Sequence, residues 1–319
     1  MAVHFAEDVT TPRAAGAALF GRTERHITCG RLRAGLDDLC AGLTDVRESM
    51  GCAEWQTFTR GVRGVPLMDL LHDDPLTCRA FHKPRGYAGD AVMMDYVYGL
   101  YAYVEAANGA SALGKDIFEW LRNRPAGRGV SFRREHIAHL IDALADETSQ
   151  PHVLAIAAGH LREIEASTAA RTGRIGRFVA LDADGESIGE VATRYAHLGV
   201  ETVKASVRDL IARKLPVGRF DFVYAAGLYD YLSNPLAQAL TERMFDLTNP
   251  GGQLLIPNFA PCCPDRAYLE TFMAWDLIYR DEFDMARLVE QIPAKRIASY
   301  DIYSDPSGSI VYLLVKKAA

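Results

Sequence analysis

The feature that most constrains the fold is a change of hydrophobic pattern near residue 150. From His152 onward, short apolar runs that end in small residues alternate with amphipathic stretches, as is typical of βαβ units in a parallel sheet. The turn sequence DPSG at 305–308 separates the last two runs, so a terminal antiparallel hairpin is expected. The expected strands cover residues 152–157, 177–182, 201–206, 220–226, 253–259, 296–304 and 309–317.

The residues before this point carry a helical pattern. Apolar residues recur at three- and four-residue spacing in the stretches 27–43, 91–107 and 133–147, and no strand pattern competes there. We therefore predict a helical N-terminal region over residues 1–145, followed by a Rossmann-like α/β domain over 146–319 with a mostly parallel seven-stranded sheet.

Composition limits the classes of function. The net charge of -6 and the scattered Lys and Arg residues disfavour a nucleic-acid partner. No signal-peptide pattern, no apolar run long enough for a membrane span and no metal-binding cysteine spacing is present. A cytoplasmic protein with reduced thiols, no metal, no membrane partner and a small-molecule substrate is expected; the oligomeric state stays open.

The turns after the first two expected strands are candidates for a nucleotide site. Gly159, in the turn AAGHLREIE, lets the backbone come close to a ligand, although a plain strand-to-helix turn would look the same. Asp182 ends the second strand. Its distance along the sequence from the turn that contains Gly159 is close to that at which Rossmann folds place a carboxylate that binds ribose hydroxyls. Its neighbour Asp184 is expected to cap the next helix.

The next two strands extend this site. Val207, in the segment Ser206–Asp209 after the third strand, is a candidate apolar contact for adenine, and a capped helix start is the alternative. After the fourth strand, several residues should face the reacting group, because ligands bind at the carboxyl ends of strands in open α/β sheets. They are Gly227, Tyr229, Asp230 and Tyr231.

These four elements, in this order and spacing, resemble the class I S-adenosylmethionine-dependent methyltransferases over about residues 150–319. The chain departs from that family at AAGHLRE, which has one glycine instead of two or three. The resemblance implies S-adenosylmethionine as the cofactor. Its implied contacts in this domain are Ala157, Gly159, His160, Arg162, Asp182, Ala183, Ser206, Val207, Arg208, Ala225 and Gly227.

Three further segments are similar to a narrower branch. They are HKPRGYAGDAVMMDYVYG at 82–99, GHLREIE at 159–165 and AWDLIYRDE at 274–282. That branch includes enzymes that make the methyl ester of 3-hydroxypalmitic acid and extends to azetidine-2-carboxylate synthases. The helical region is accordingly expected to act as a lid over the cofactor.

The segment PRGYAGD has the glycines, charges and aromatic ring of a binding loop that includes Tyr87. Arg85 could bind the methionine carboxylate as a bidentate fork, and Asp90 could hold the ammonium group. His160 and Arg162 compete for the carboxylate, or bridge a helix to the sheet.

Aromatic residues form a second group of candidates. Tyr98 lies among four tyrosines at 96, 98, 101 and 103, which one helix cannot point in the same direction; those facing the site could pack against a sulfonium. The set Trp275, Tyr279 and Arg280 could cover the substrate, with core packing as the alternative.

A sulfonium activates three carbons, and positioning decides which one reacts. Methyl transfer to a small carboxylic or hydroxy-acyl acceptor is the first hypothesis, and it is favoured by analogy with this fold. The second is cyclisation of the cofactor to azetidine-2-carboxylic acid with release of methylthioadenosine, for which Tyr229, Asp230, Tyr231 or Ser233 could serve as catalytic groups. The third is a non-catalytic cofactor-binding protein.

Overall fold

A computed structural model describes residues 12–319, which form two compact units. The first unit comprises residues 12–88, 106–121 and 264–276, and the second comprises residues 89–105, 122–263 and 277–319. The helical region was expected over residues 1–145, and its described residues, 12–145, belong partly to each unit. Its first 11 residues lie outside the described part of the chain.

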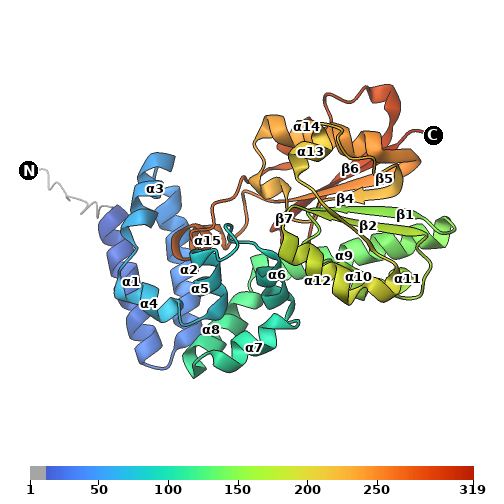
Figure 1. Cartoon of the computed structure of the whole chain (residues 1–319). Helices are drawn as coiled ribbons and strands as arrows, with labels where there is room; N and C mark the ends of the chain where they lie inside the picture. The colour runs from blue at the N-terminus through green and yellow to red at the C-terminus, as the bar shows by residue number, and fades with distance from the viewer. Residues whose placement is uncertain (1–11) are drawn as a thin grey trace, which may run out of the picture. The chain divides into compact units, whose positions relative to one another are not determined.

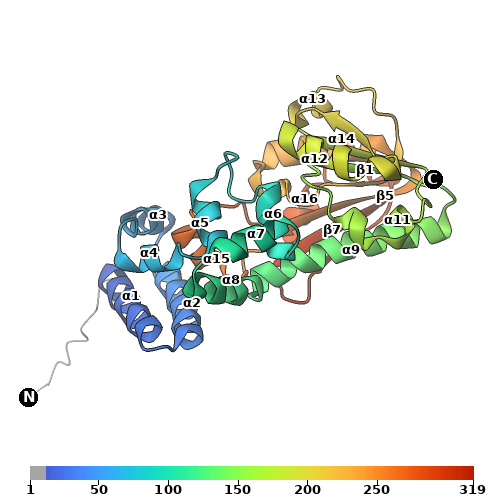
Figure 2. The same ribbon diagram turned by 60° about the horizontal axis from the view of Figure 1, so that its bottom comes forward.

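The first unit is built from helices. Two further helices, α7 (Ala102–Gly109) and α8 (Ala112–Arg122), run from one unit into the other. The helices of the first unit are α1 (Pro12–Thr28), α2 (Leu32–Glu48), α3 (Cys52–Gly61), α4 (Pro66–Leu71), α5 (Pro75–His82) and α15 (Arg266–Phe272). Figure 2 shows α1 and α2 side by side, and the buried face of α2 carries Leu36, Leu39 and Leu43 at helical spacing.

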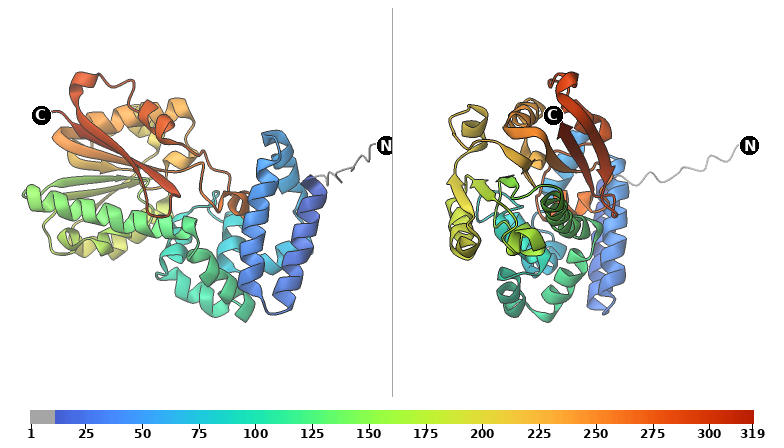
Figure 3. Two further views of the ribbon diagram at one scale, coloured as in Figure 1. Left: turned by 180° about the vertical axis from the view of Figure 1, so that it is seen from behind. Right: turned by 90° about the vertical axis from the view of Figure 1, so that its right-hand side faces the viewer.

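The second unit contains a seven-stranded sheet in the order β3-β2-β1-β4-β5-β7-β6. Strands β3, β2, β1, β4 and β5 pair in parallel, whereas β7 pairs antiparallel with both β5 and β6. Figure 3 shows the terminal hairpin at one edge of the sheet. The strands are β1 (His152–Ile156), β2 (Arg177–Asp182), β3 (Glu201–Lys204), β4 (Phe220–Tyr224), β5 (Thr248–Phe259), β6 (Ile297–Ser304) and β7 (Ile310–Lys317).

This topology confirms the expected Rossmann-like fold. All seven strands form within a few residues of their expected positions, and the hairpin turn lies at the DPSG sequence. The largest difference is that β5 begins at Thr248 rather than near residue 253, because the segment before the Gly-rich turn already pairs with β4.

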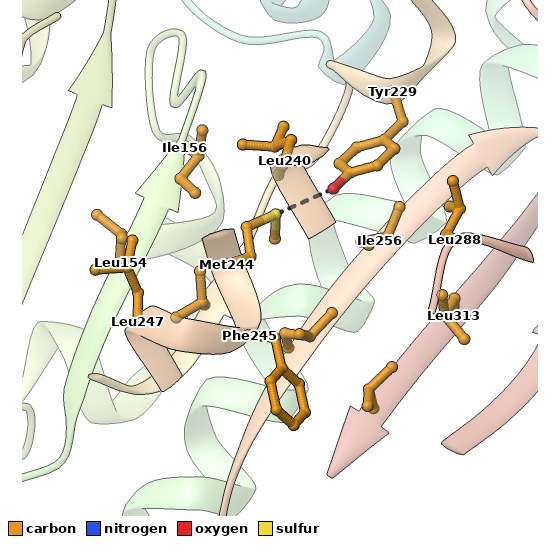
Figure 4. Packing of buried hydrophobic residues seen from close by; sticks show 14 of the residues in the cluster. Leu154, Ile156, Tyr229, Leu240, Met244, Phe245, Leu247, Ile256, Leu288 and Leu313 are labelled. Carbon is orange, nitrogen blue, oxygen red and sulfur yellow. Dashed lines mark hydrogen bonds between the residues drawn. The ribbon is translucent and has the colours of Figure 1, made fainter. Parts of the chain in front are cut away.

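Helices cover both faces of the sheet. The helices of this unit are α6 (Ala91–Tyr98), α9 (Pro125–Glu147), α10 (Glu163–Ala166), α11 (Thr168–Arg171), α12 (Gly185–Arg194), α13 (Val207–Ile211), α14 (Asn234–Leu247) and α16 (Glu282–Arg287). Figure 1 shows α9 to α12 below the sheet and α13 and α14 above it. The helices above the sheet pack on it through a hydrophobic core to which α14 contributes Leu240, Met244 and Phe245 (Figure 4).

The stretch 91–107, whose pattern is helical throughout, is interrupted at Gly99. Gly99 has φ 70°, and its amide hydrogen-bonds to the carbonyls of Asp95 and Tyr96, which ends α6. The left-handed conformation suits glycine because it lacks a Cβ. Tyr98 and Tyr103 consequently lie on different helices.

We predict that Leu240→Ala lowers the free energy of unfolding by about 2–5 kcal/mol, because truncating a buried leucine loses transfer free energy and leaves a cavity. The control is Phe283→Ala on α16, where the side chain is 84% exposed and the expected change is below about 0.5 kcal/mol. Denaturant titration followed by circular dichroism measures both. Equal losses in the two variants would contradict the assignment of Leu240 to the core.

Candidate functional site

The sheet order places a topological switch point between β1 and β4. From β1 the chain continues to β2 on one side, and from β4 it continues to β5 on the other. Ligands of open α/β sheets bind outside the carboxyl ends of the strands at such a point. The candidate site is therefore bounded by residues 157–161 after β1 and residues 225–231 after β4, both in the second unit.

The loop after β1 has an unusual backbone. Ala157, Gly159 and Leu161 have φ values of 51°, 54° and 53°, so left-handed residues alternate with ordinary ones. A Cβ added to Gly159 would lie 3.3 Å from the Cβ of Ala91, which is tighter than an ordinary contact. The left-handed conformation and the close approach of α6 both favour glycine at this position.

Asp182, at the end of β2, is bound to this loop. One carboxylate oxygen accepts the Gly159 amide at 2.8 Å, the other accepts the Asp184 amide at 2.8 Å, and the residue is 8% exposed. Asp184 accepts the Glu186 and Ser187 amides, which confirms it as the cap of α12. The adjacent Ala183 is exposed.

The segment after β3 forms the capping box of α13. The Ser206 hydroxyl accepts the Asp209 amide at 3.2 Å and donates to the Asp209 carboxylate at 2.6 Å. The helix-start interpretation is therefore correct for these two residues. Val207 is half-buried and Arg208 is exposed, and adenine contact by Val207 stays a prediction.

Helix α6 is fixed to the loop after β1 by a buried ionic cluster. Asp90 caps α6 by accepting the Met93 amide at 2.8 Å. Asp95 accepts the Nε and Nη2 hydrogens of Arg162 at 2.7 and 2.8 Å, and His160 Nδ1 lies 2.9 Å from the same carboxylate. Burial opposes ionisation of Asp95, but the hydrogen bonds from Arg162 and His160 lower its pKa below the ordinary value.

The Arg162 guanidinium is also bonded on its other side. Nη1 donates to the Tyr195 hydroxyl at 3.1 Å, and Nη2 donates to Glu190 at 2.9 Å. This arrangement favours the bridging alternative for Arg162 over a role in binding the methionine carboxylate. His160 shares the Asp95 carboxylate and lies in the same buried cluster.

The residues after β4 are less accessible than a catalytic role suggests. The Tyr229 hydroxyl lies 2.9 Å from Thr241 Oγ1 and 3.3 Å from Met244 Sδ, inside the core drawn in Figure 4. Asp230 is buried and accepts the Phe259 amide at 2.7 Å, and burial raises its pKa to about 6. Tyr231 and Ser233 are exposed, whereas Ala225 is fully buried in the core.

Arg280 is fully buried and holds the loop after β4. Its Nη1 donates to the Tyr229 carbonyl at 2.7 Å and to Asn258 Oδ1 at 2.7 Å. Its Nη2 donates to the Leu232 carbonyl at 2.6 Å and to Asn234 Oδ1 at 3.0 Å. These bonds favour the packing alternative for Arg280.

The remaining expected residues divide between the units. Arg85, Tyr87 and Trp275 belong to the first unit, whereas Tyr98 and Tyr279 belong to the second. Arg134 lies over the Tyr98 ring, with 5.5 Å from Cζ to the centroid. The structure thus joins Gly159 to Asp182 and places His160 and Arg162 in one cluster, while the roles expected for the remaining residues, including those of the first unit, stay predictions.

Sequence reasoning missed two charged residues of the second unit. Glu163 is buried and accepts the Tyr224 hydroxyl at 2.6 Å, and burial raises its pKa. Arg133 on α9 is also buried, and it shares a helix face with Val130, Ile137 and Ile141. The sequence signal for Arg133 was a charged residue on the apolar face of a predicted helix.

Within residues 12–319 no group of three or more His, Cys, Asp or Glu residues could hold a metal ion. In the same part of the chain no helix is long and apolar enough to cross a membrane.

Comparison with known proteins supports the fold. Residues 153–252 match the family model described as a methyltransferase domain. No curated protein sequence matches the chain. A possible exported protein from Bordetella parapertussis has a similar structure, with a TM-score of 0.58, 12% identity, and coverage of 99% of this chain and 100% of that one.

Two methyltransferases have lower structural similarity. Magnesium protoporphyrin IX methyltransferase from Synechocystis PCC 6803 has a TM-score of 0.45 and 14% identity, covering 60% of this chain and 86% of that one. The N-methyltransferase NodS from Bradyrhizobium japonicum WM9 has a TM-score of 0.44 and 14% identity, covering 70% and 100%. Residues 153–252 thus match a methyltransferase domain, and the strand order of the sheet to which they contribute fits the Rossmann-like fold of the class I methyltransferases.

Proposed function

We propose that this chain binds S-adenosylmethionine at the carboxyl edge of its sheet and transfers the methyl group to a small carboxylic or hydroxy-acyl acceptor. The observation that carries the proposal is the bond between Asp182 and the Gly159 amide, within a segment that matches a methyltransferase domain. It joins the two positions that a nucleotide cofactor needs in this fold, the ribose-binding carboxylate and the close-approach glycine.

The residues present fit such a cofactor. Each Asp182 oxygen accepts one backbone amide, so each keeps a lone pair for a ribose hydroxyl. Half-buried Val207 offers an apolar surface for the adenine ring. When bound, S-adenosylmethionine supplies a methyl group activated by a sulfonium.

The chemistry of the loop after β4 favours an acceptor that is already charged. Tyr229 and Asp230 are both engaged in bonds that hold the fold. A carboxylate nucleophile needs no base, so the chain has only to orient it and exclude water. Cyclisation would instead require the cofactor ammonium to be deprotonated first.

We also propose the class of substrate, the metabolic role and the part played by the N-terminal helices. The net charge of -6 supports a small-molecule substrate over a nucleic acid. The similarity of residues 82–99 to the narrower branch supports a role in small-molecule metabolism, with the N-terminal helices as a lid. Helix α6 already contributes Asp95 to the cluster behind the loop after β1.

The direct test incubates the purified full chain with S-adenosylmethionine, with and without 3-hydroxypalmitate, and identifies the nucleoside released. We expect S-adenosylhomocysteine and a methyl ester, both dependent on the added acid. Methylthioadenosine formed without acceptor would instead establish cyclisation. Tight binding with no product from a panel of carboxylic and hydroxy-acyl acceptors would support the non-catalytic hypothesis.

We predict that Asp182→Ala weakens S-adenosylmethionine binding by about 1.5–3 kcal/mol, the scale of hydrogen bonds to a charged group. Asp184→Ala is the matched control, because it removes the cap of α12 and should cost about 1 kcal/mol of stability without a comparable loss of affinity. Titration calorimetry and thermal unfolding measure the two effects. Unchanged affinity in Asp182→Ala would remove this residue from the site.

We predict that Tyr229→Phe retains methyl transfer within about threefold. The substitution removes only the hydroxyl, which the structure places against Thr241 and Met244, so the expected cost is about 0.5–1.5 kcal/mol of stability. Steady-state kinetics and denaturant titration measure the two quantities. A rate loss of a hundredfold or more in a folded variant would show that Tyr229 takes part in proton transfer.

A further inference from the structure

Arg133 is a buried cation with few hydrogen-bond acceptors. The residue is 4% exposed, and its Nη2 donates to the thioether of Met94 at 3.6 Å, a weak acceptor. Its Nε has no hydrogen-bond partner among the described residues. The Tyr98 phenol hydrogen-bonds to the guanidinium, and Asp230 and Tyr312 also interact with it electrostatically.

Two other buried arginines of this unit differ from Arg133. The Nε of Arg280 also has no hydrogen-bond partner among the described residues, but its two Nη groups donate to four oxygens. Arg162 forms a bidentate pair with Asp95 and reaches two further oxygens. Within residues 12–319, no carboxylate forms an ion pair with Arg133. A buried guanidinium with so few acceptors is costly, so a group absent from the chain itself is expected to satisfy its remaining donors.

The charge on Arg133 persists despite burial. Desolvation opposes the charge, but interactions with Tyr98 and Asp230 outweigh it and raise the pKa of Arg133. Asp230 acts on this charge electrostatically, and no ion pair joins its carboxylate to Arg133 among the described residues. The guanidinium therefore keeps its charge, while its Nε has no acceptor among the described residues and its Nη2 has only a weak one in Met94.

Arg133 lies at the candidate site. A Cβ added to Gly227 would lie 3.6 and 3.7 Å from Nη2 and Nη1, so the guanidinium approaches the loop after β4 at a residue that has no side chain. Helix α6 supplies Met94 to Arg133, and Ala91 of the same helix approaches Gly159 in the loop after β1. Arg133 and the two loops thus surround the switch point between β1 and β4.

We propose that Arg133 binds a ligand carboxylate at the carboxyl end of β4. A guanidinium presents paired donors that match the two oxygens of a carboxylate. The carboxylate comes either from the methionine part of the cofactor or from the acceptor. The inference rests on the proposed function, and it assigns recognition of the carboxylate to a residue of α9.

The experiment compares the full-length wild type with Arg133→Met, which removes the charge at similar length, and Arg133→Lys, which keeps it. Titration calorimetry measures S-adenosylhomocysteine and methylthioadenosine, which lacks the amino-acid part. Acetate is titrated as the minimal carboxylate, with and without saturating S-adenosylhomocysteine. Arg128→Met, an exposed position on the same helix, is the control.

If the cofactor carboxylate is the ligand, Arg133→Met should bind S-adenosylhomocysteine about 10- to 100-fold more weakly and methylthioadenosine within about twofold of the wild type. Arg133→Lys should recover part of the loss. If the acceptor carboxylate is the ligand, both nucleosides bind normally, and acetate binding is lost in Arg133→Met alone.

Three results would overturn the inference. Affinities for both nucleosides and acetate could match the wild type, the two nucleosides could weaken together, or wild-type protein could bind none of the probes. The second result would assign Arg133 a structural role. Thermal unfolding verifies folding, and Arg133→Lys takes the place of Arg133→Met if the latter does not fold. Failure of the wild type to bind either nucleoside while it binds acetate through Arg133 would refute the proposed cofactor but not the carboxylate site.

Discussion

The candidate site depends on the buried pair between Asp95 and Arg162. The pair joins α6 to the turn that follows β1, and it is closed on the other side by Tyr195 and Glu190. Removing one partner of a buried ion pair leaves an uncompensated charge, which typically costs about 3–5 kcal/mol. This pair holds α6 beside Gly159 and so helps to set the conformation of the loop after β1.

The loop after β4 is organised in the same way. Arg280 binds the carbonyls of Tyr229 and Leu232 and the amide oxygens of Asn258 and Asn234. A buried arginine therefore fixes each loop at the switch point through several acceptors at once. Such preorganised loops suit a reaction in which the protein contributes mainly orientation. Arg133 is also buried but has fewer acceptors, and this difference is the basis on which we propose it as a ligand-binding group.

The strands could be predicted from the sequence because their signal is local. Short apolar runs such as 177–182 are buried on both faces, and their order in the chain restricts the possible sheet topologies. The cap at Asp184 and the capping box at Ser206 were predictable for the same reason, since a cap involves residues two or three positions apart.

The site itself was harder to predict because its contacts are long-range. Nothing in the sequence near Arg162 indicates that its partner is Asp95. Tyr229 was expected to face the reacting group, but the short turn after β4 directs its side chain into the core. The limit expected at residue 146 follows a real change of pattern. A domain limit at residue 146 would assign α6 and α9 to the helical region, although their tertiary contacts place them in the same unit as the sheet.

The single glycine after β1, where the family has two or three, finds a physical explanation in the backbone. Ala157 and Leu161 adopt the left-handed conformation that glycine adopts without strain, at a cost of about 1–2 kcal/mol each. Burial of the Leu161 side chain and the bond from the Gly159 amide to Asp182 offset that cost. The conformation of this loop is thus imposed by its surroundings rather than by glycine content. In this loop the glycine lies where an added Cβ would come within 3.3 Å of the Cβ of Ala91 on α6.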